Sequence, residues 1–278
     1  MLKLILKKAN NYLTTRKLVR KYKKTAQKLK IDIDNKYTEL TIKDKNKIFV
    51  CWLQGMESAP DLVKMCYRSL LKHHPDKEII VITEENFSDY VKFPQFILDK
   101  YNKGYISKTH FSDLLRLELL ITYGGTWVDA TLYFTDSIPD YILNSDFFLF
   151  QDFNEHNRGT KSISSWFISS CANNKLLLLE RALLYNYWSK NNKLCHYYLF
   201  HKIFSNFVIK LYDKEWSEVI ISDNASPKIL DCYLFKPFNE EVYKIVADKS
   251  FAHKLMYKYS QEQFEKPGTL YQHLLEIS

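Results

Sequence analysis

Three ionisable side chains between residues 107 and 135 have the types and the spacing to do chemistry together. Asp113 and Arg116 are one helical turn apart in an apolar stretch, so they share a helix face and can hold each other or a common ligand. Asp129 interrupts the apolar run that follows, "GGTWVDATLYFT". Burying a carboxylate there costs several kcal/mol of free energy unless a cation or a hydrogen-bond donor contacts it. We therefore expect Asp129 to end a strand at a cleft, with Arg116 and a metal ion as candidate partners.

The stretches that must position these residues predict an α/β domain. Residues 47–55 and 77–86 are nearly continuous apolar runs, which predict buried strands. Residues 60–73, 93–104 and 107–125 have helical spacing. Strands of this kind that alternate with helices are typical of a largely parallel sheet with both faces covered.

Ligands bind such sheets beyond the carboxyl ends of the strands. Trp52 and Gln54 end the first predicted strand, so they should reach the same edge as Asp129. Each residue also has a plainer interpretation. The Asp113–Arg116 pair could be an exposed helix pair worth a few tenths of a kcal/mol, and Trp52 could be part of the core. The order of all these features along the chain favours a site.

Beyond residue 136 the pattern weakens. Residues 146–153 predict a strand, and residues 162–170 predict a short strand or a strand followed by a turn. Residues 175–190 and 194–211 predict helices. Residues 216–224 and 243–255 predict strand or loop elements. No linker or repeat divides this part of the chain, so we expect one domain over residues 36–278, preceded by a helical arm over residues 1–35.

The segment "SDLLRLELLITYGGTWVDATLYFT" resembles the signature of glycosyltransferase family 32, in its bacterial capsular polysaccharide synthesis branch. That signature is S-D-x-x-R, a helix, and then G-G-x-x-x-D-x-D or a variant. The similarity extends from about Lys47 to Lys258. It implies a GT-A-like fold, a single Rossmann-like nucleotide-binding domain that moves a hexose from a nucleotide diphosphate sugar, with UDP as the expected nucleotide. It also implies retention of the anomeric configuration and a growing capsular or surface polysaccharide, expected to be lipid-linked, as acceptor.

The resemblance also assigns roles to residues that would bind the donor. Trp52, with Gln54 beside it, should stack on the nucleotide base, which a flat indole suits. Asp113 and Arg116 should hold the hydroxyls of the sugar and the diphosphate. Two residues near the C-terminus should reach the phosphates: Lys254 and Tyr257. With no nucleophile placed by the sequence, the resemblance implies front-face attack, in which the leaving phosphate takes the proton of the acceptor.

A divalent cation, Mn²⁺ or Mg²⁺, is the cofactor that the resemblance implies, because it neutralises a leaving diphosphate. Asp129 should meet the ribose or the metal, with Thr131 and His253 as the other expected metal ligands. Asp129, Asp113 and Arg116 are the expected catalytic residues. The usual D-x-D motif has Asp where this chain has Thr131, and a hydroxyl is the weaker ligand for a hard metal. Asp129 and His253 could still complete a site with phosphate oxygens and water. We interpret the change as a variant of the branch that keeps its activity.

The net charge of +8 comes from the N-terminal segment of the chain. Residues 1–30 contain 11 Lys or Arg and no acid, which leaves 29 basic and 32 acidic residues elsewhere, a net charge of about −3. We therefore expect no nucleic-acid partner. Residues 11–30 predict a helix with an apolar stripe and basic flanks. This helix suits an anionic membrane surface, or it is a solvated helix that docks on the domain by its stripe.

Five cysteines without paired spacing indicate reduced thiols, and no window is long enough for a signal peptide or a membrane span. We expect a cytoplasmic protein, or one peripheral to the inner face of the plasma membrane. Two other functions fit part of the pattern. A toxin-like transferase that glycosylates a protein would share the donor site, and a non-enzymatic module that binds anionic surfaces would explain the arm alone.

Overall fold

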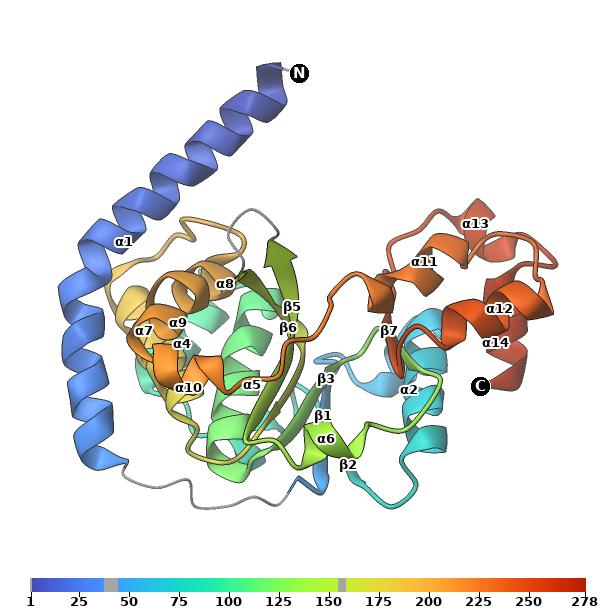
Figure 1. Ribbon diagram of the computed structural model, residues 1–278, viewed down its shortest axis with the longest axis horizontal. Coiled ribbons are helices and arrows are strands. Elements are labelled where there is room, and N and C mark those ends of the chain that lie inside the picture. Colours follow the sequence, from blue (N-terminus) through green and yellow to red (C-terminus); the bar gives the residue numbers. More distant parts are fainter. Residues whose placement is uncertain (1, 38–44, 155–158) are drawn as a thin grey trace.

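The computed structural model describes residues 2–37, 45–154 and 159–278, and its centre is a five-stranded sheet (Figure 1). The strand order is β2-β1-β3-β6-β5. Strand β1 pairs in parallel with β2 and β3, whereas β6 is antiparallel to both β3 and β5. Four strands therefore point the same way and β6 runs against them, which confirms a mixed α/β fold with a mostly parallel sheet. The strand bounds are Lys47–Cys51 (β1), Glu78–Ile82 (β2), Gly125–Asp129 (β3), Phe147–Asn154 (β5) and Gly159–Ser170 (β6).

Helices pack on both faces of this sheet (Figure 1). One face carries α5 (Lys108–Tyr123) and α7 (Lys175–Lys190), whose leucines share a core with Phe49 and Trp127. The opposite face is covered by α2 (Asp61–His73), by α6 (Asp140–Leu143) and by a small two-stranded sheet. The predicted helix at residues 60–73 is confirmed, and one face of it is buried, with Leu62, Met65, Cys66, Ser69 and Leu70 among its buried residues.

The apolar run from Gly124 to Thr135 forms two strands in different sheets. Strand β3 ends at Asp129, and β4 (Leu132–Phe134) leaves the central sheet to pair antiparallel with β7 (Ala252–Lys254). The carboxylate therefore lies at a strand end, as the sequence predicts.

Two glycines and a serine fix the helix that leads into β3. Ser107 accepts a hydrogen bond from the backbone of His110 at the start of α5. Gly124 ends the helix with φ of 70°, and Gly125 has φ of 96°. A Cβ on Gly125 would lie 2.5 Å from the carbonyl oxygen of Lys47, so only glycine fits where β3 begins beside β1.

Helix α1 (Leu2–Lys36) runs along the outside of α7, and its N-terminal part extends past the body of the molecule (Figure 1). Tyr22, Ala26 and Ile33 are buried in the same core as α7. Asp34 pairs with Lys175 at 3.3 Å. The docked interpretation of the arm is therefore correct for the second half of the helix.

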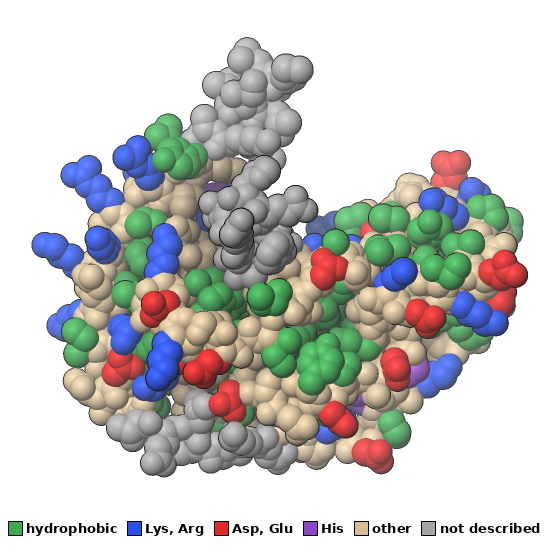
Figure 2. Space-filling model, viewed as in Figure 1, with side chains coloured by type: hydrophobic (Ala, Val, Ile, Leu, Met, Phe, Trp, Pro, Cys, Tyr) green, Lys and Arg blue, Asp and Glu red, His purple; other side chains and the backbone are tan. Residues whose placement is uncertain are grey.

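The described side chains of α1 from Asn11 to Lys21 include four exposed cations, Arg16, Lys17, Arg20 and Lys21. Tyr12 is 63% exposed, and basic side chains line the described part of the helix (Figure 2). None of the described helices combines the length and the apolar composition that a membrane span requires. The interpretation of this segment as a membrane-binding surface stays a prediction.

The C-terminal part is more helical than the sequence suggests. The predicted helix at 194–211 forms as α8 (Leu199–Ile203), a π-helical turn and α9 (Ile209–Leu211). The strand or loop expected at 243–255 is wrong for its first part, because 243–247 belong to α12 (Glu240–Ala247) and only the end forms β7. The remaining helices are α3 (Phe87–Tyr90), α4 (Gln95–Asn102), α10 (Asp213–Ser217), α11 (Ile229–Tyr233), α13 (Gln261–Glu265), α14 (Leu270–Ile277) and the short turns Met56–Ser58 and Ser226–Lys228.

Candidate active site

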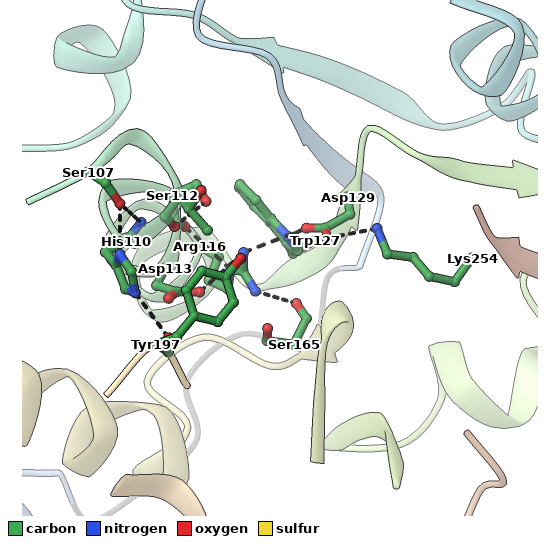
Figure 3. A network of polar contacts seen from close by, with 11 residues as sticks. Ser107, His110, Ser112, Asp113, Arg116, Trp127, Asp129, Ser165, Tyr197 and Lys254 are labelled. Carbon is green, nitrogen blue, oxygen red and sulfur yellow. Dashed lines mark hydrogen bonds and ion pairs between the residues drawn. The ribbon is translucent and has the colours of Figure 1, made fainter. Parts of the chain in front are cut away.

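The buried guanidinium of Arg116 is the centre of a polar cluster at the carboxyl end of β3 (Figure 3). Its Nη2 lies 3.3 Å from Asp113 Oδ1 and 3.6 Å from Asp129 Oδ1. Its Nη1 donates to the carbonyl oxygen of Ser165 on β6 at 2.6 Å. The ring of Trp127 lies under the guanidinium at 4.9 Å. These partners fix Arg116 between α5, β3 and β6.

Asp129 receives donors from two sides. Trp127 Nε1 donates to Oδ1 at 3.0 Å, and Lys254 Nζ lies 3.3 Å from Oδ2 (Figure 3). Burial alone would raise the pKa of Asp129, but the charges of Lys254 and Arg116 outweigh it and hold the pKa below its usual value. Asp129 is therefore a carboxylate at neutral pH.

Asp113 lies deeper, on α5, and its environment acts in the opposite direction. Burial raises the pKa of Asp113 above its usual value, although the charge of Arg116 pulls it down. The two carboxyl groups that share Arg116 therefore differ in how readily they ionise. Asp129 ionises more readily, and Asp113 is protonated more readily.

Lys254 reaches the cluster because β7 pairs with β4. The register places Lys254 opposite Leu132, and Leu255 N donates to the carbonyl oxygen of Thr131 at 2.9 Å. The ammonium then donates to Thr131 Oγ1 as well as contacting Asp129. Three of the residues singled out in the sequence therefore meet at the β3–β4 turn.

His253 does not join them. It is fully buried, and its Nε2 is within hydrogen-bond distance of Thr135 Oγ1 at 3.1 Å and of the carbonyl oxygen of Ala247 at 3.2 Å. Neighbouring strand residues point to opposite sides, so Lys254 faces Asp129 and His253 faces away. Burial lowers the pKa of His253 to about 4, which keeps the ring neutral.

The described residues do not fit the metal site that the resemblance implies. Asp129 and Thr131 offer one carboxylate and one hydroxyl, and both contact the ammonium of Lys254. Over the described ranges, no group of three or more His, Cys, Asp or Glu side chains is arranged to hold a metal ion. A nucleotide-bound Mg²⁺ or Mn²⁺ needs one or two carboxylates besides phosphate oxygens and water, and here the ammonium of Lys254 already contacts both side-chain oxygens of the turn.

A cavity of about 860 Å³ opens beside the cluster. Asp113, Arg116, Asp129 and Lys254 line one part of it, together with Lys202 and Lys228. The volume is in the range that small-molecule sites occupy.

Tyr197 and Tyr198 line the same cavity, and sequence reasoning missed both. They are 62% and 54% exposed, with their rings edge to face at 5.0 Å. His110 on α5 holds this loop, because its Nε2 is 3.0 Å from the carbonyl oxygen of Tyr197 (Figure 3). The aromatic run "HYY" was the available signal, although it was hidden among the 20 Tyr of the chain.

Trp52, Gln54 and Tyr257 lie at the same sheet edge but do not line this cavity. Cys51 pairs with Asp129 in the sheet, so Trp52 follows directly beyond the strand end. Its ring meets that of Tyr257 edge to face at 5.7 Å. The indole Nε1 is buried and has no hydrogen-bond partner among the described residues. Gln54 is exposed.

The fold and the cluster define an α/β protein with a charged cavity at the carboxyl ends of its parallel strands. The chain belongs to the capsular polysaccharide synthesis protein family, whose model matches residues 2–274. Among solved structures, the PaToxG glycosyltransferase is similar, at 16% identity and a TM-score of 0.41, over 96% of this chain and 97% of that one. That likeness is too distant to indicate an activity. No curated protein matches the chain significantly.

Proposed function

We propose that the protein is a glycosyltransferase that moves a hexose from a nucleotide diphosphate sugar, with UDP the expected nucleotide, to a capsular or surface saccharide. The observation that carries this proposal is the convergence of Arg116 and Lys254 on Asp129 in a cavity at the strand ends. Cations beside an ordered carboxylate suit a ligand that has both phosphates and hydroxyl groups. Membership of the capsular polysaccharide synthesis family supports the same class of product.

The donor would lie across the carboxyl ends of β1 and β3. None of the described residues accepts a hydrogen bond from the buried Nε1–H of Trp52, and a ligand that accepted it would remove the cost of leaving this group unpaired. We place the base beside Trp52 and Tyr257, the diphosphate at Lys254, and the sugar towards Asp113 and Arg116. This order follows the edge of the sheet from β1 into the cavity.

The reaction is a single exchange at the anomeric carbon of the donor sugar. The hydroxyl oxygen of the acceptor bonds to that carbon, the bond from the carbon to the phosphate oxygen breaks, and the hydroxyl proton passes to the leaving diphosphate. Retention follows if the acceptor enters on the face from which the diphosphate leaves. In this scheme Arg116 and Asp113 orient the sugar, and the protein contributes positioning and charge rather than a nucleophile.

The acceptor would enter from the opposite side of the cavity. Exposed aromatic rings that line a polar cavity suit the apolar face of a sugar, which Tyr197 and Tyr198 provide. Asn11 of α1 also lines the cavity, so the exposed cations that follow it on the helix, from Arg16 to Lys21, lie near the acceptor side. A lipid-linked acceptor at an anionic membrane surface fits that arrangement.

Product analysis tests the proposal. The protein is incubated with UDP-hexoses and with two kinds of acceptor: a lipid-linked saccharide and a set of proteins. Mass spectrometry should find one hexose added to the saccharide and none to the proteins. Hexose on protein would instead identify a protein-modifying transferase. Failure of UDP and GDP sugars to bind in calorimetry would reject the proposed donor class.

A further inference from the structure

Lys254 occupies the position at the Asp129–Thr131 turn that a divalent cation would need. Its Nζ lies 3.3 Å from Asp129 Oδ2 and donates to Thr131 Oγ1. These are the side-chain oxygens that a D-x-D-type turn would offer to a metal. An ion held by both oxygens would have to displace the ammonium or lie against it, and like charges in so small a space repel strongly.

Strand pairing places Lys254 at this position. Strands β4 and β7 pair directly after the turn, and the bond from Leu255 N to the carbonyl oxygen of Thr131 measures 2.9 Å. The ammonium is therefore placed by a strand pairing and not by a mobile tail. Its side chain is 23% exposed and lines the cavity, so the face that is turned away from Asp129 is open to a ligand.

The charges at the turn balance without a metal. A turn with two carboxylates carries a charge of about −2, which a divalent ion offsets. Here Thr131 is uncharged and Asp129 carries a single negative charge, which Lys254 offsets, while the charge of Arg116 is shared between Asp129 and Asp113. The Thr at this position and the Lys that contacts it thus form a matched pair.

We propose that Lys254 takes the place of the divalent cation and binds the diphosphate of the donor, so that this chain binds its nucleotide without metal. The inference rests on the proposed function, since it assumes a nucleotide diphosphate donor. Asp129 fixes the ammonium, and Lys254 Nζ–H groups donate to the phosphate oxygens. When the bond between the anomeric carbon and the phosphate oxygen breaks, the electron pair stays on the diphosphate, and Lys254 stabilises that charge.

Calorimetry with UDP and GDP, in EDTA and then in excess manganese chloride, tests the inference on the unaltered protein. We expect the same dissociation constant in both conditions, within about twofold. Lys254→Met should weaken binding by roughly tenfold or more in EDTA, because a charge-assisted contact is lost. Lys249→Met is the matched control, since Lys249 is exposed and outside the cavity, and it should bind as the parent does.

A double variant, Thr131→Asp with Lys254→Met, tests the exchange directly. It restores two carboxylates at the turn and removes the ammonium, so its nucleotide binding should become dependent on manganese. Binding by the parent protein only in manganese would overturn the inference while the proposed function stood. If neither nucleotide binds in either condition, both the proposed function and this inference are rejected. Circular dichroism of each variant confirms that the protein is folded.

Discussion

Arg116 Nη2 lies 3.6 Å from Asp129 Oδ1, and this contact ties the long helix α5 to the end of β3. The guanidinium also donates to the carbonyl oxygen of Ser165 on β6. One side chain thereby holds three elements around the cavity, and it is only 5% exposed. Arg116 consequently has a structural role as well as the role in donor binding that we propose for it.

Arg116→Ala should cost both stability and donor binding. Removing the cation leaves Asp113 and Asp129 without it in a partly buried cluster, which is expected to cost about 3–5 kcal/mol of unfolding free energy. Urea unfolding measures this change. Arg68→Ala is the control, because Arg68 is exposed and its loss should cost less than about 0.5 kcal/mol. Equal effects of the two substitutions would contradict a central structural role for Arg116.

Asp129→Asn should remove activity and leave the fold intact. Asparagine still accepts from Trp127 Nε1, but it no longer holds Lys254 by charge, and we expect turnover to fall roughly a hundredfold or more. Because this side chain is 29% exposed, the change in unfolding free energy should stay within about 1 kcal/mol. Steady-state kinetics and thermal unfolding check the two parts. A loss of stability that matches the loss of activity would make Asp129 a structural residue.

The parts of this architecture that depend on local spacing could be predicted from the sequence. The Ser107 cap, the glycine turn at 124–125 and the end of a strand at Asp129 each follow from a few neighbouring residues. The Asp113–Arg116 pair follows from the period of one helix.

The parts that depend on distant pairing could not be predicted. Lys254 and Thr131 are 123 residues apart in the chain, and only the pairing of β4 with β7 brings them together. The same pairing turns His253 away from the cluster, whereas the family resemblance alone made it a metal ligand. Helix α12 was missed because 243–247 carry apolar residues that suit a strand as well as a helix.

Replacing Tyr197 and Tyr198 together with Ala should affect the acceptor and spare the donor. Each exposed ring offers a stacking surface worth about 0.5–1.5 kcal/mol, so the KM for the acceptor should rise roughly tenfold. The dissociation constant of UDP should not change. Tyr105→Ala is the control, since Tyr105 is 43% exposed and lies outside this cavity. An unchanged KM in the double variant would indicate that the acceptor binds elsewhere.

Glu180→Gln should make the protein more stable at neutral pH. Glu180 on α7 is fully buried, and neither of its carboxyl oxygens has a hydrogen-bond partner in the described part of the chain. Burial, with a smaller contribution from Asp113, raises the pKa of Glu180 well above its usual 4.5. The contribution of protonated Glu180 to the free energy of unfolding is therefore fully present below about pH 4.5. It is lost as the pH rises through the raised pKa of Glu180.

Urea unfolding of parent and variant across this pH range measures the difference. The stability gained by Glu180→Gln should grow from about pH 4.5 upwards, where glutamine carries no charge that must be desolvated. Glu241→Gln, on the exposed face of α12, should show no such growth. A gain that is the same at every pH would show that ionisation of Glu180 plays no part in stability.

The two halves of α1 should behave differently when they are altered. The second half is held by buried contacts, among them the bond from Asn191 Nδ2 to the hydroxyl of Tyr22 at 3.1 Å. Deleting residues 1–30 would remove Tyr22 and Ala26 from the core, so that deletion is expected to unfold the protein. A test of membrane binding must therefore alter only the exposed cations.

Replacing four exposed cations of α1 with Gln should release the protein from anionic membranes: Arg16, Lys17, Arg20 and Lys21. Each cation near an anionic surface contributes about 1 kcal/mol, so the partition constant should fall roughly a thousandfold. Sedimentation with phosphatidylserine vesicles measures it, and added salt should weaken binding of the parent protein. The matched control replaces four exposed lysines elsewhere: Lys236, Lys244, Lys249 and Lys266. Equal losses in both variants would indicate a net-charge effect, and no loss in the first would exclude α1 as the membrane-binding surface.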